Sequence, residues 1–225
     1  MPLPLDIVEA LVRTIELKDR CTASHTWRVV LYTRALAESL GADRELIKRV
    51  SRAAALHDVG KIDIPDEVLL KPARLTPDEF EVIKTHTTLG HERLVRMGED
   101  DPLVLELVRH HHERMDGTGY PDRLTARSIP SAAKYFSVVD TFDALTSVRP
   151  YRASVGKDAA ESAIDELQRG VGSRYCAESV AAFAMLFRTG NLNWILENFN
   201  DGAALPVFGG PEMAEEATGR LRRRE

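Results

Sequence analysis

The chain repeats one pattern: apolar residues spaced three and four apart, separated by short polar breaks, which is typical of amphipathic helices. After Pro4, the pattern is carried by Leu5, Val8, Val12 and Ile15. It predicts a helix over residues 3–18, packed on the body of the protein. A second helix is expected from about residue 22 to 41, and a third between Asp43, a good N-cap residue, and Leu56. No stretch shows the strict alternation of a β-strand, so the sequence predicts an all-α fold.

Capping signals and prolines place the other helices. Thr76, Pro77 and Glu79 combine an N-cap, a first-turn proline and a capping box. They predict a helix that continues through His86 to about residue 97. A short helical turn over 64–72 and helices over 102–113, 130–148, 157–169, 178–188 and 192–199 are also expected. We interpret residues 1–200 as one helical domain, with 1–18 as its N-terminal helix, and 201–225 as a flexible C-terminal tail.

Composition narrows the function classes. The 225 residues carry a formal net charge of -5, which argues against a protein that coats DNA or RNA but permits a small anionic ligand. Cys21 and Cys176 are far apart and form no CxxC motif, as expected in a reducing compartment. No apolar run approaches the length of a membrane span, and the acidic N-terminal stretch is unlike a signal peptide. The sequence therefore predicts a cytoplasmic protein.

The most informative residues are a His57-Asp58 pair at the predicted end of a helix, followed by Gly60 and Lys61. Imidazole nitrogen and carboxylate oxygen both bind divalent first-row metals, and a carboxylate can also bridge two ions. One such pair is a weak signal, because most His-Asp pairs are ordinary polar residues.

Other histidines strengthen the metal hypothesis. Five of the seven lie at or near predicted helix ends, and two aspartates could join them: His25, His57, His86, His111 and His112, with Asp58 and Asp140. Each of these residues alone is more often structural than a ligand. Together they are what a helical bundle needs to build a two-metal site in its core. We treat His91 and His110 as non-ligands.

These motifs, in this order, resemble the HD-GYP family of HD phosphohydrolases. The matching segments are His57-Asp58-x-Gly60-Lys61, His86-x-x-x-Gly90, His111-His112-Glu113, Asp116-Gly117-x-Gly119-Tyr120-Pro121, Asp140-x-x-Asp143 and Arg149-Pro150-Tyr151-Arg152. The resemblance covers roughly residues 19–183. It implies an HD-type helical bundle with the metal site in its core.

The resemblance also implies roles for single residues. Asp58 would bridge two metals, His57 and Asp140 would bind one of them together with His25, and His86, His111 and His112 would bind the other. Lys61, Arg149 and Arg152 would neutralise charge on a phosphate, and Tyr120 and Asp143 would contact the substrate. The ions are usually iron or manganese. Cys21 stands where members with a third metal carry glutamate, which favours two divalent ions here.

The implied activity is hydrolysis of cyclic di-GMP to linear pGpG by a hydroxide that bridges the metals. GMP as a further product, a homodimer, and a signalling partner at the Gly-Tyr-Pro loop remain open. One alternative keeps the site but changes the substrate to another cyclic dinucleotide or a nucleotide. Another is a non-catalytic sensor of the dinucleotide or an interaction module. Because a degenerate sensor would be expected to lack ligands, the complete ligand set favours catalysis.

Overall fold

The computed structural model describes residues 2–19, 23–147, 157–199 and 211–221. Its helices are α1 (Leu5–Lys18), α2 (Ala23–Ser39), α3 (Arg44–Leu56), the 3-10 helix η1 (Val59–Asp63), α4 (Asp66–Leu69), α5 (Pro77–Lys84), α6 (His86–Arg96), α7 (Pro102–His110), α8 (Ser131–Thr146), α9 (Lys157–Arg169), α10 (Ala177–Arg188), α11 (Asn193–Asn198) and α12 (Pro211–Leu221). Apart from two isolated β-bridges, the described residues contain no extended pairing, so the all-α prediction is confirmed. None of the described helices is long and apolar enough to cross a membrane.

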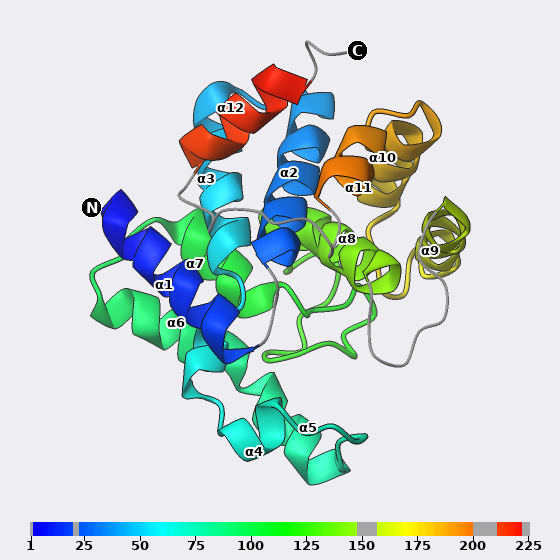
Figure 1. Cartoon of the computed structure of the whole chain (residues 1–225). Coiled ribbons are helices and arrows are strands. Elements are labelled where there is room, and N and C mark those ends of the chain that lie inside the picture. Colours follow the sequence, from blue (N-terminus) through cyan, green and yellow to red (C-terminus); the bar gives the residue numbers. More distant parts are fainter. Residues whose placement is uncertain (1, 20–22, 148–156, 200–210, 222–225) are drawn as a thin grey trace.

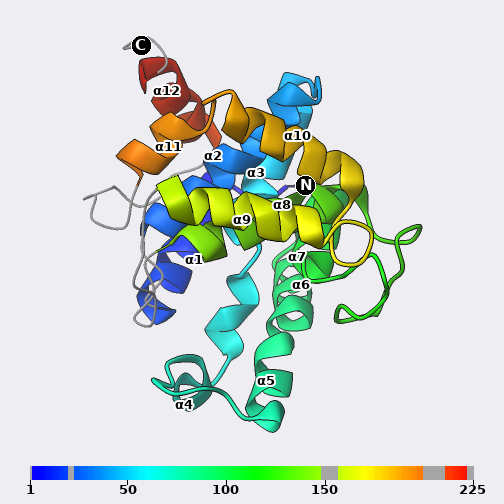
Figure 2. The same ribbon diagram turned by 90° about the vertical axis from the view of Figure 1, so that its right-hand side faces the viewer.

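Four helices form the centre of the bundle. α2 packs against α3 and α8, while α7 packs against α3 and α8 from the other side (Figure 1). Tyr32 of α2 meets the ring edges of Phe142 and Phe183 at centroid distances of 5.4 and 5.9 Å, which joins α2, α8 and α10 in one aromatic core. α4 and α5 project from this body in both views (Figures 1 and 2).

The predicted caps are present. The Asp43 side chain accepts a hydrogen bond of 2.8 Å from the backbone N–H of Leu46 at the start of α3. Thr76 and Glu79 form the reciprocal capping box at the start of α5. These local signals therefore fix where two of the helices begin.

The helix predicted from residue 77 to 97 is interrupted. It ends as α5 at Lys84, and α6 begins at His86 after Thr85. The interruption lies where the chain leaves the projecting α5, which has no buried residue, and enters α6, which buries His86, Gly90 and Leu94. A helix over 77–97 was expected because periodicity does not report a change of packing partner.

The C-terminal stretch also differs from the expected flexible tail. Residues 211–221 form α12, which packs on α2 and α3. Ala214 and Thr218, one helical turn apart, are 0% and 7% exposed. Glu215 on the same helix pairs with Arg44 at 3.0 Å. Burial of this narrow face is the physical reason that the segment is helical here.

Candidate metal centre

Asp58 lies between two groups of histidines. Its Oδ2 is 3.1 Å from Nε2 of His57, and its Oδ1 is 3.4 Å from Nε2 of His86. One group brings ligand atoms of His25, His57 and Asp58 within 4.8 Å of one another, and the second does the same for His86, His111 and His112. One carboxylate thus faces two potential metal positions, as a bridging ligand must.

The ligands reach this point from four parts of the bundle. His25 comes from the first turn of α2, His57 and Asp58 follow α3, His86 begins α6, and His111 and His112 follow α7. Gly90, one turn after His86, permits the close packing of η1 on α6. A Cβ on Gly90 would lie 3.0 Å from the backbone nitrogen of Gly60. The approach of η1 brings Asp58 to His86.

Three histidines use the same device to aim their rings. Nδ1 of His57, His86 and His111 lies 2.7, 2.7 and 2.9 Å from the backbone carbonyl three residues earlier. Because a carbonyl can only accept, each Nδ1 carries a proton, and Nε2 is the nitrogen that faces the centre. The Nε2 atoms of His86 and His111 are 3.3 Å apart, so they converge on one point. This tautomer fits metal binding.

Burial controls the charge of the centre. It lowers the pKa of His86, and it lowers the pKa of His111 and His112 well below the ordinary value for histidine. Burial would raise the pKa of Asp58, but His57 and Lys61 outweigh it and hold this pKa well below its ordinary value. Neutral imidazoles at His86, His111 and His112 beside an ionised Asp58 form a donor set that suits a divalent cation.

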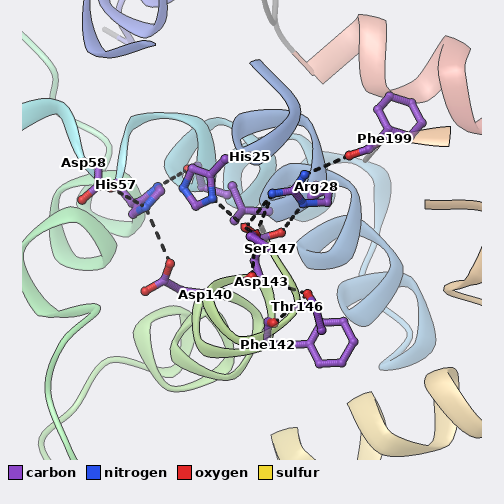
Figure 3. A network of polar contacts seen from close by, with 12 residues as sticks. His25, Arg28, His57, Asp58, Asp140, Phe142, Asp143, Thr146, Ser147 and Phe199 are labelled. Carbon is purple, nitrogen blue, oxygen red and sulfur yellow. Dashed lines mark hydrogen bonds and ion pairs between the residues drawn. The ribbon is translucent and has the colours of Figure 1, made fainter. Parts of the chain in front are cut away.

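Asp140 and Lys61 lie at the edge of the centre. Oδ1 of Asp140, on α8, is 3.9 Å from Nε2 of His57, and its side chain is 21% exposed (Figure 3). Nζ of Lys61 is 2.9 Å from Oδ2 of Asp58 and 2.6 Å from Oδ2 of Asp19, at the end of α1. The sequence did not identify Asp19, because no motif spacing connects it with Asp58 and Lys61, which lie 39 or more positions further along the chain.

Tyr120 forms one wall beside the second histidine group. Its ring lies 4.8 Å from the ring of His112, tilted by 34°, and edge-to-face with Phe80 of α5 at 6.4 Å. Nζ of Lys84 is 5.6 and 5.7 Å from the ring centroids of Phe80 and Tyr120. Burial, and then the carboxylates of Asp58 and Asp140, raise the pKa of the Tyr120 phenol, so it remains protonated.

Glu113 holds the Tyr120 loop in place. Its buried carboxylate accepts backbone hydrogen bonds from Asp122 at 2.7 Å and Leu124 at 3.0 Å. His110 also lies near these acids. The guanidinium of Arg109 donates two bonds of 2.8 Å to Asp122 and balances the charge of that carboxylate. The interpretation of His110 as a non-ligand stays a prediction, since His110, Glu113 and Asp122 bring ligand atoms within 4.8 Å of one another.

Asp143 does not lie where the sequence suggested. Its side chain is 1% exposed, beneath His25, whose Nδ1 is 2.7 Å from its Oδ2 (Figure 3). Arg28 of α2 donates to both carboxylate oxygens. This burial leaves no surface for the substrate contact expected from the motif. Arg149, Arg152 and Cys21 lie outside the described residues.

A comparison with protein families decides the classification. A family model described as HD domain matches residues 9–178, which is well over half of the chain. The chain belongs to the HD domain family. The HD-GYP resemblance and the HD-type bundle with a core metal site, both expected from the sequence, agree with this membership.

Curated relatives of this HD domain are named as phosphodiesterases. The cyclic di-GMP phosphodiesterase of Thermotoga maritima is 40% identical over 184 residues, covering 80% of this chain and 49% of the relative. The cyclic di-GMP phosphodiesterase response regulator RpfG of Xanthomonas campestris pv. campestris is 43% identical over 156 residues, covering 69% and 41%. Three 3'3'-cGAMP-specific phosphodiesterases of Vibrio cholerae are 33–36% identical. The HD chain spans about half the length of the curated relatives it matches, or less.

A solved structure supports the fold. Bd1817, described as an HDG"Y"P protein of Bdellovibrio bacteriovorus, superposes with a TM-score of 0.59 at 20% identity, covering 74% of this chain and 53% of that chain. At this identity the likeness concerns the fold of the HD domain only.

Proposed function

We propose that this chain is a metal-dependent phosphodiesterase that opens cyclic di-GMP to linear pGpG. The observation that carries the proposal is the position of Asp58, whose two oxygens face two separate histidine groups. The names of the relatives in Thermotoga maritima and Xanthomonas campestris support the substrate.

The ligand sets fit two divalent ions. His57 and Asp58, with Asp140 and His25 beside them, would hold one ion, and His86, His111 and His112 with Asp58 would hold the other. Imidazole and carboxylate donors together suit iron or manganese. When bound, such a pair supplies an activated water and neutralises charge on the reacting phosphate. The chain contributes neutral imidazoles, a fixed carboxylate and an exclusion of bulk water by burial.

Lys61 and the aromatic wall would handle the substrate. The Lys61 ammonium beside Asp58 is placed to neutralise negative charge that develops on a phosphate oxygen. Phe80 is 47% exposed and borders Tyr120, so the exposed part of its ring can stack on a nucleobase. We assign substrate binding to Lys61, Tyr120 and Phe80.

A second substrate is favoured by one observation. The cGAMP-specific relatives are only slightly less similar than those named for cyclic di-GMP. The two cyclic dinucleotides differ in one purine base, so a stacking surface such as Phe80 would accept either, and hydrogen bonds at the base edges would decide between them.

The test is a product analysis of the purified, metal-assayed protein under anaerobic conditions, with iron or manganese supplied. Cyclic di-GMP and 3'3'-cGAMP would be incubated in parallel and the products separated by chromatography. We expect linear pGpG from the parent and none from His57→Ala or Asp58→Ala. Faster cleavage of cGAMP would move the assignment to that substrate. No product from a metal-loaded protein would overturn the proposed phosphodiesterase.

A further inference from the structure

His25 differs from the other candidate ligands in how its ring is held. His57, His86 and His111 sit at or just after the C-terminal end of a helix, where the last carbonyls have no partner within the helix and can accept from Nδ1. His25 is instead the third residue of α2, so no carbonyl of α2 lies three residues before it. The free backbone groups of that first turn are N–H donors, which cannot accept a proton from a ring nitrogen.

A carboxylate takes the place of the missing carbonyl. Oδ2 of Asp143, on α8, lies 2.7 Å from Nδ1 of His25. Because the carboxylate can only accept, Nδ1 carries the proton and Nε2 is the nitrogen left for the group formed with His57 and Asp58. The ring centroids of His25 and His57 are 5.6 Å apart, which places both histidines on the same side of the centre (Figure 3).

Arg28 holds the carboxylate itself. It lies three residues after His25 and therefore on the same face of α2. Its Nε and one terminal nitrogen donate to the two oxygens of Asp143 at 2.5 and 3.2 Å. The guanidinium also donates to the Ser147 hydroxyl at 2.8 Å and to the Phe199 carbonyl at 3.0 Å. With its side chain 5% exposed, Arg28 is fixed at four points between α2, α8 and the end of α11.

We propose that Asp143 is a positioning residue for His25 and that Arg28 keeps Asp143 in place. The hydrogen bonds from Arg28 to Asp143 and from His25 to Asp143 fix the tautomer and the direction of the His25 ring. Its Nε2 then points toward the metal position that His25 shares with His57 and Asp58. Asp140 and Asp143, one turn apart on α8, then have different tasks: Asp140 stands beside His57 at the centre, whereas Asp143 supports a ligand from behind. This inference rests on the proposed metal centre but not on the identity of the substrate.

The first test reads the metal-free protein. In nitrogen-15 NMR spectra of the histidine side chains, His25 should appear as the Nδ1–H tautomer with a strongly hydrogen-bonded proton. Asp143→Asn should shift or broaden that signal, because an amide that turns its oxygen to His25 presents its NH₂ group to Arg28. The signals of His57, His86 and His111 should not change, since their partners are backbone carbonyls.

The second test measures metal affinity with buffered manganese. Asp143→Asn should weaken manganese binding at the site of His25, His57 and Asp58 about 10- to 100-fold. Manganese binding at the site of His86, His111 and His112 should not change. Asp101→Asn is the matched control, because Asp101 is also paired with an arginine but is the N-cap of α7, at the end opposite His111 and His112. In a His25→Ala background, Asp143→Asn should cause no further loss. If Asp143→Asn does not fold, Arg28→Lys takes its place in both tests.

The outcomes separate the two hypotheses. Unchanged manganese affinity in Asp143→Asn, or a loss that adds fully to that of His25→Ala, overturns the positioning role. A parent protein that binds no metal contradicts the proposed function instead.

Discussion

Gly60 touches the backbone of His86. A Cβ on Gly60 would lie 1.8 Å from the His86 carbonyl oxygen and 2.5 Å from the backbone nitrogen of Gly90. No flexible side chain separates the two segments, so only glycine permits η1 to pack here. The metal centre depends on this contact, because Asp58 lies directly before η1 and His86 is the first residue of α6.

Gly60→Ala should therefore destabilise the fold and separate the two histidine groups. We expect a loss of about 3 kcal/mol or more, since backbone atoms must move to admit the methyl group, together with weakened binding of the second metal. Gly41→Ala is the control: Gly41 has a positive φ but no atom near its Cβ position, so it should cost about 1 kcal/mol and leave metal binding intact. Chemical denaturation and metal titration measure both effects. A folded Gly60→Ala protein with parental metal affinity would contradict the argument.

Lys61→Gln should reduce turnover about 100-fold while both metals stay bound, because the ammonium is assigned to charge that develops on the phosphate. Lys71→Gln removes a comparable lysine–carboxylate pair, with Glu79, away from the centre and should leave turnover unchanged. The measurements are kcat and metal content of each variant. Loss of metal from Lys61→Gln would show that Lys61 supports the ligands rather than the reaction.

Phe80→Ala should raise the KM for the cyclic dinucleotide about tenfold with little change in kcat, because a base that stacks on an exposed ring contributes about 1–3 kcal/mol. Val82→Ala changes another exposed apolar residue of α5 and should have no effect. Steady-state kinetics compare the two. Equal KM values for Phe80→Ala and the parent would remove Phe80 from the substrate site.

Asp101→Asn should make the free energy of unfolding less dependent on pH in acid. The hydrogen bonds from Arg49 lower the pKa of Asp101 below its ordinary value of 3.8. A carboxyl group with a lowered folded-state pKa stabilises the protein above its unfolded pKa and loses that effect as the pH falls through the folded pKa. Asparagine also caps helices well, so the loss at neutral pH should be at most about 1 kcal/mol. Denaturation at several pH values should show that the difference in unfolding free energy between the parent and Asp101→Asn disappears as the pH falls below 3.8. A difference that grew in acid would contradict the lowered pKa of Asp101.

Local sequence signals predicted much of the fold. The Asp43 cap, the Thr76–Glu79 capping box and the proline-led start of α7 depend on neighbouring residues, so they can be read from the chain directly. α12 was not expected, because its buried face consists of small residues in a charged stretch and is stabilised by contact with α2 and α3.

Only part of the candidate site could be predicted from the sequence. The histidines and Asp58 follow from residue types and motif order, and they do converge. The place of Asp143 could not be predicted, because its partner Arg28 is 115 positions away and nothing in the spacing connects them. For the same reason Asp19 and Phe80 were not identified, since each meets the centre only through the packing of α1 or α5.

The measurement that tests the account most directly is hydrolysis of cyclic di-GMP during a manganese titration of the metal-free parent. If Asp58 joins two metal positions in one centre, activity should stay near zero up to about one equivalent of metal and rise to its maximum at about two. Asp58→Ala should remain inactive throughout. Full activity with a single bound metal, or activity in Asp58→Ala, would contradict the proposed two-metal phosphodiesterase.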